Sequence, residues 1–95
     1  MEKIGIAFRS VLTADEVRDT YIRPLRATLK EHKAGIYSNH LRQVDPDAIF
    51  PTEHLLVFEV KDFKSGLHLL RMELEKIGAP EGTQFQNLNP STPGY

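Results

Sequence analysis

Residues 54–60 read HLLVFEV, and this stretch decides the fold. Five of its seven residues are apolar, whereas a strand with one face in water alternates apolar and polar side chains. The run therefore predicts a strand in the middle of a sheet. Because successive side chains point to opposite faces, Leu56, Phe58 and Val60 can face one layer, while Leu55 and Val57 must face the other side.

Three further strands are predicted around this one. Residues 3–9, KIGIAFR, alternate, with isoleucine and phenylalanine on one face and small or charged residues on the other. Residues 36–44 and 83–88 are more polar and also have the length of strands. The two apolar segments suit central positions in a sheet, and the two polar segments suit its edges.

The first predicted helix begins at Thr13, which stands three residues before Glu16 in the pattern of a reciprocal N-terminal cap. Pro24 lies inside the helix and should either kink it or split it in two. Gly35 fits the left-handed position that ends a helix. The apolar stripe comprises Val17, Tyr21, Ile22, Leu25 and Leu29.

The second predicted helix is capped by Asp62 and stopped by Gly78 and Pro80. Its apolar residues recur at intervals of four and three, the most regular helical spacing in the chain. They are Phe63, Leu67, Leu70, Leu74 and Ile77.

The order strand, helix, strand, strand, helix, strand resembles that of a ferredoxin-like α/β plait. The resemblance implies an α+β fold with a four-stranded antiparallel sheet and both helices on one of its faces. We expect a single domain over residues 1–88, with 89–95 as a loose tail.

Composition excludes several functions. Twelve basic residues against 13 acidic ones give a net charge of −1, without the basic excess that nucleic-acid or anionic-membrane binding requires. The chain has no cysteine and no apolar run long enough to span a membrane, and because its opening residues lack the pattern of a secretory signal, we expect none. No catalytic or phosphate-binding motif is present. We expect a cytoplasmic protein that needs no cofactor or metal and is not primarily an enzyme.

The polar segment 35–43, GIYSNHLRQ, has two interpretations. In the first, its polar side chains protect a sheet edge from pairing with other chains; in the second, some of them contact a ligand or partner. Simple alternation places Tyr37, Asn39 and Leu41 on one face and Ile36, His40 and Val44 on the other. His40 could also meet His54 across two strands, near Glu53, Asp45 and Asp47, in a weak candidate metal cluster.

The sheet face without helices suggests the function. Leu55 and Val57, with Tyr37 or Phe85, would expose apolar area there that isolated monomers usually avoid. We therefore expect a non-catalytic binding module that forms a homodimer or contacts a protein partner, through this face or through the edge 36–44. The alternative is a dimer that binds a small ligand between sheet and helices, with possible enzyme activity. The candidate contact residues are Tyr37, Asn39, His40, Arg42, His54, Leu55 and Val57.

Overall fold

The computed structural model describes residues 1–43 and 52–88. The elements in chain order are β1 (Glu2–Ser10), α1 (Ala14–Val17), η1 (Arg18–Ile22), α2 (Arg23–Glu31), β2 (Gly35–Gln43), β3 (Thr52–Val60), α3 (Phe63–Ile77) and β4 (Gln84–Asn87). Val44, Asp45, Asp47 and the predicted tail 89–95 lie outside the described residues.

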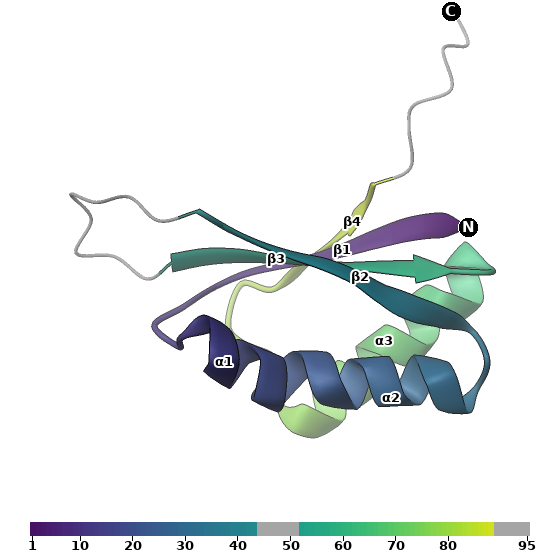
Figure 1. The fold of residues 1–95 in the computed structure, drawn as a ribbon, viewed down its shortest axis with the longest axis horizontal. Coiled ribbons are helices and arrows are strands. Elements are labelled where there is room, and N and C mark those ends of the chain that lie inside the picture. The colour runs from purple at the N-terminus through teal and green to yellow at the C-terminus, as the bar shows by residue number, and fades with distance from the viewer. Residues whose placement is uncertain (44–51, 89–95) are drawn as a thin grey trace, which may run out of the picture.

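The four strands form one sheet in the order β2-β3-β1-β4, and every neighbouring pair is antiparallel. The predicted division into central strands 1 and 3 and edge strands 2 and 4 is therefore confirmed. The helices cover one face of the sheet, and the described residues place no helix over the other (Figure 1). Among the described residues, no helix is both long enough and apolar enough to cross a membrane.

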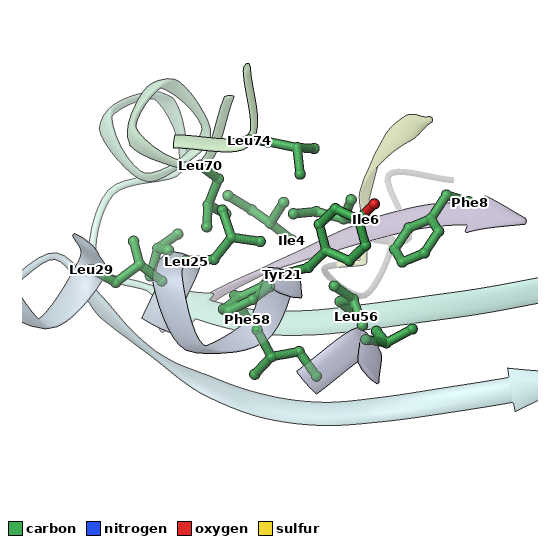
Figure 2. Close-up of a cluster of buried hydrophobic side chains, with 13 residues drawn as sticks. Ile4, Ile6, Phe8, Tyr21, Leu25, Leu29, Leu56, Phe58, Leu70 and Leu74 are labelled. Carbon is green, nitrogen blue, oxygen red and sulfur yellow. The ribbon is translucent and has the colours of Figure 1, made fainter. Parts of the chain in front are cut away.

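The hydrophobic core lies between the sheet and the helices (Figure 2). Alternation on β1 and β3 sends every second side chain into this layer, where the helical stripes meet them. The predicted inward orientation of Leu56, Phe58 and Val60 is confirmed, because all three are fully buried in the core. Their partners from the other elements are Ile4, Ile6, Phe8, Val17, Tyr21, Ile22, Leu25, Leu29, Leu70 and Leu74.

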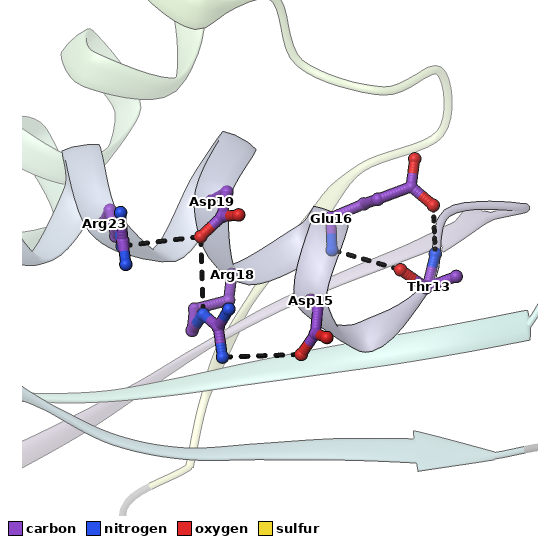
Figure 3. A network of polar contacts seen from close by, with 6 residues as sticks. All are labelled: Thr13, Asp15, Glu16, Arg18, Asp19 and Arg23. Carbon is purple, nitrogen blue, oxygen red and sulfur yellow. Dashed lines mark hydrogen bonds and ion pairs between the residues drawn. The ribbon is translucent and has the colours of Figure 1, made fainter.

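The first helix begins as predicted. The hydroxyl of Thr13 accepts the N–H of Glu16, and the carboxylate of Glu16 accepts the N–H of Thr13, both at 3.2 Å. Arg18 and Arg23 then pair with Asp15 and Asp19 at 3.4 Å along the exposed side of the run (Figure 3). Such exposed ion pairs add little stability. The N-terminal cap and the buried apolar stripe therefore stabilise this helix more than these ion pairs do.

Pro24 lies just after a π-helical segment, where the helix is wider than an ordinary turn. The N–H of Arg23 donates to the carbonyl of Arg18, five residues back. A proline ring clashes with the carbonyl four residues before it, and one widened turn is a known way to relieve that crowding. The helical run from Ala14 to Glu31 is thus continuous through the proline, with a local widening in place of a break.

The predicted role of Gly35 as a helix end is wrong. The helix ends at Glu31, and Lys33 adopts the left-handed conformation, with φ 51°. Gly35 is instead the first residue of β2, where an added Cβ atom would lie only 2.2 Å from the carbonyl oxygen of Glu59. Glycine is required there because two backbones approach closely. At the end of α3, by contrast, Gly78 has φ 101° and ends the helix as predicted.

Candidate functional site

A β-bulge in β2 determines which of its side chains face which layer. Tyr37 lies opposite Phe58 and Asn39 lies opposite Val57, so Ser38 is an extra residue with no partner on β3. One extra residue reverses the alternation of the strand beyond it. The Oδ1 atom of Asn39 accepts the N–H of His40 at 2.8 Å, directly after the bulge.

The faces predicted for β2 are therefore partly wrong. Tyr37 is on the helix side, where its ring meets Phe58 edge-on at 5.7 Å, and burial raises the pKa of its hydroxyl. His40 is on the same side, opposite Leu56. Asn39 and Leu41, as predicted, share the other face. The simple alternation failed because it could not include the bulge.

His40 and His54 meet on the helix side of the sheet, as the sequence suggested. Nε2 of His40 lies 3.0 Å from Nδ1 of His54, so one imidazole donates a single proton to the other. His54 is fully buried and stacks on Phe8 at 5.3 Å, and Phe8 in turn contacts Tyr21 at 5.2 Å. A row of four rings thus runs from the core to the edge strand at His40.

Burial disfavours the charged form of both imidazoles in this pair. Burial lowers the pKa of His40 below its ordinary value, and the positive charges of His54 and Arg42 act in the same direction. Burial also lowers the pKa of His54, with a smaller opposing effect from the backbone of Ser10. Nε2 of His54 has no partner that meets hydrogen-bond geometry among the described residues. The two imidazoles thus bond to each other inside an apolar layer, while Nε2 of His54 is left without a described hydrogen-bond partner.

The carboxylates expected beside the histidines do not join them. Glu53 precedes His54 on β3 and so points to the opposite face. Asp45 and Asp47 lie outside the described residues. Within residues 1–43 and 52–88, no three histidine or acidic side chains are grouped so as to hold a metal ion.

We call the sheet surface away from the helices the open face. Strand pairing arranges it in four rows that run across the sheet. The two central rows carry no charge. One consists of Asn39, Val57, Gly5 and Gln86, and the other of Leu41, Leu55, Ala7 and Gln84.

Charged residues lie only in the outer rows of the open face. At one end Lys3 is opposite Glu59, and at the other Arg9 is opposite Glu53. Each end therefore carries one positive and one negative side chain, with the positive one on β1 and the negative one on β3. This pattern cannot be recognised in the sequence, because it becomes visible only once the register of β1 against β3 is known.

The centre of the open face is apolar, as predicted for Leu55 and Val57. Leu88 directly follows β4, and its N–H donates to the carbonyl of Lys3. The side chains of Leu88 and Leu55 approach closely above Gly5. Val57 is only 8% exposed, while Leu41 is 49% exposed at the edge.

Phe85 and Tyr37 do not contribute to the open face, contrary to the prediction. Phe85 lies opposite Ile6, and its ring packs on the core side beneath the guanidinium of Arg71, 5.1 Å away. Arg42 lies opposite His54, on the helix side, and is exposed. The seven candidate residues thus divide between two surfaces. Asn39, Leu55 and Val57 belong to the open face; Tyr37, His40, Arg42 and His54 belong to the helix side.

A shallow hollow of about 270 Å³ lies on the open face. The residues that line it are Ala7, Leu41, Arg42, Gln43, Glu53, Leu55 and Gln86. A larger hollow, of about 550 Å³, lies between α2 and α3 on the far side of the molecule, where acidic and basic side chains are mixed. Of the residues that line the hollow on the open face, Ala7, Leu41, Leu55 and Gln86 belong to the uncharged rows, while Arg42, Gln43 and Glu53 do not.

Comparison of the chain with protein-family models, with curated proteins and with solved structures found no match. The function is therefore inferred from the geometry of the two surfaces.

Proposed function

We propose that this chain is a ferredoxin-like plait that works as a non-catalytic binding module and self-associates through its open face. The strand order, the antiparallel pairing and the helices on one side support the fold assignment. The two uncharged central rows of the open face carry the functional proposal. Leu55, Leu41 and Ala7 form an apolar strip there that no described helix covers, beside Val57, which is already largely buried in the monomer.

Burial of this strip against a second copy is favourable because apolar area removed from water contributes roughly 25 cal/mol per Å². Contact through the edge of β2 is less well supported. The bulge at Ser38 interrupts the ladder, and the exposed side chains of Arg42 and Gln43 follow it. Bulges and charges are features that keep an edge strand from pairing with another chain.

Charged substitutions on the open face test this proposal by light scattering on a sizing column. Val57→Glu places a carboxylate in the central row and should convert a dimer to a monomer. Leu41→Glu should act in the same direction, and because Leu41 is 49% exposed, the change leaves the monomer fold intact. Met72→Glu is the matched control, since Met72 is 54% exposed on α3, away from the open face.

An unchanged dimer mass in both open-face variants would exclude this face as the contact surface. Far-UV circular dichroism on the same samples separates loss of association from loss of folding.

The histidine pair favours a second candidate function, a small-ligand site on the helix side. A buried imidazole nitrogen without a partner, as in His54, is the kind of group that a ligand can satisfy. Among the candidate residues, His40 and His54 bring their rings into direct contact, while Asn39, which accepts the backbone N–H of His40, belongs to the open face. A thermal-shift screen tests this function: ligand-induced stabilisation that disappears in His40→Phe would support it, and a screen without shifts would count against it.

A further inference from the structure

We infer that two copies of this chain pack open face to open face, about a two-fold axis that runs along the strands. This inference rests on the proposed self-association and adds its geometry. In such an arrangement β1 of one copy lies over β3 of its partner, and each row lies over the same row. Face-to-face sheets keep their strands within about 30° of each other, so the rows stay in approximate register.

Charge favours this axis. With the axis along the strands, Lys3 lies over the partner's Glu59 and Arg9 lies over the partner's Glu53. Every charged contact is then between opposite signs, and symmetry repeats it. The outer rows allow this because each has its positive residue on β1 and its negative residue on β3.

The other in-plane two-fold axis runs across the strands and reverses the order of the rows. It would place Lys3 over the partner's Arg9 and Glu53 over the partner's Glu59. All four symmetry-related contacts would then join like charges, which disfavours association. The charge pattern therefore distinguishes the two dimers.

Side-chain size favours the same axis. With the axis along the strands, Leu55 lies over the partner's Ala7, where the hollow of about 270 Å³ offers room for it. Across the strands, Leu55 would lie over the partner's Val57, and Ala7 over the partner's Gly5, which the side chains of Leu88 and Leu55 already cover. Large apolar side chains would then oppose one another, and this dimer would lack the fit of Leu55 into the hollow.

Charge reversal at Arg9 tests the axis, because the two dimers predict opposite signs. Arg9→Glu places a carboxylate over the partner's Glu53 if the axis runs along the strands, and the dimer Kd should rise about tenfold or more. If the axis runs across the strands, the same change creates two attractive contacts with the partner's Lys3, and the Kd should fall. Analytical ultracentrifugation at low salt measures both.

Mixing two variants provides the positive control. Glu53→Arg alone should also weaken the homodimer, since Arg9 then faces the partner's new arginine. An equimolar mixture of Arg9→Glu and Glu53→Arg should form a heterodimer with an affinity near that of the wild type, because both inter-copy contacts again join opposite charges. Thermal melts of each variant check that the monomer remains folded.

Ala7→Leu adds a readout that does not depend on charge. It fills the hollow and should weaken a dimer whose axis runs along the strands, because the partner's Leu55 loses the space that it would occupy.

If the wild-type chain forms a dimer and Arg9→Glu lowers its Kd or leaves it unchanged, the proposed axis is wrong, although self-association stands. A wild-type chain that stays monomeric would overturn the proposed function itself. The two failures are therefore distinguishable.

Discussion

Nε2 of His40 lies 3.0 Å from Nδ1 of His54, which joins the edge strand β2 to a fully buried ring on β3. The contact can be made by two neutral imidazoles or by one neutral and one protonated imidazole, but two protonated rings would each present a proton to the other. The contact between β2 and β3 at His40 therefore depends on the protonation of the two imidazoles, and so on pH.

Acidification should weaken folding through this pair. Burial lowers the pKa of both rings in the folded state, so the unfolded chain binds protons more readily. The stabilisation is then complete above the ordinary histidine pKa, near 6.5, and is lost as pH falls through the lowered values. Urea unfolding at neutral pH and near pH 5 should show a lower free energy of unfolding at the acidic pH.

Substitution identifies the origin of this effect. His54→Phe should flatten the pH dependence in this range, because it removes the buried imidazole. His68→Gln is the matched control, since His68 is exposed on α3, and it should leave the dependence unchanged. Equal stability at both pH values in the wild type would contradict this role for the pair.

Thr13→Ala should lower the free energy of unfolding by about 1 kcal/mol, because the helix loses the side chain that accepts the N–H of Glu16. Thr13→Ser retains the hydroxyl and should cost much less. Denaturant midpoints at constant m-value measure both changes. An alanine variant as stable as the serine variant would mean that the cap does not limit the stability of this helix.

Gly35→Ala should be more damaging than an ordinary glycine substitution. Its Cβ atom would lie 2.2 Å from the carbonyl oxygen of Glu59, so β2 and β3 must separate, at a cost of about 1–3 kcal/mol or more. Gly82→Ala is the comparison: Gly82 has φ 78° but open space around it, so only backbone strain of about 1 kcal/mol is expected. Equal losses in thermal melts would contradict the close-approach explanation.

The sequence predicts most of the scaffold because its signals are local. The cap at Thr13, the cap at Asp62 and the alternation of β1 each depend on residues a few positions apart, and the structure contains all three. The apolar run of β3 likewise identifies a central strand. The side that each of its residues faces follows from alternation alone, and Leu55 and Val57 lie on the open face as predicted.

The errors occur where pairing between distant segments decides the outcome. The bulge at Ser38 depends on how β2 aligns with β3, and polar side chains on both faces of β2 give no sequence signal for it. Gly35 was misassigned for a similar reason, since its close neighbour, Glu59, is distant in the chain. The charge pattern of the outer rows also requires the register of β1 against β3.

Sedimentation equilibrium of the wild-type chain, from about 1 to about 100 micromolar, tests self-association through the open face most directly. We predict a weight-average mass that rises with concentration toward twice the chain mass of 10.8 kDa, and that stays lower over the same range in Leu41→Glu. A wild-type mass that remains 10.8 kDa throughout would contradict self-association.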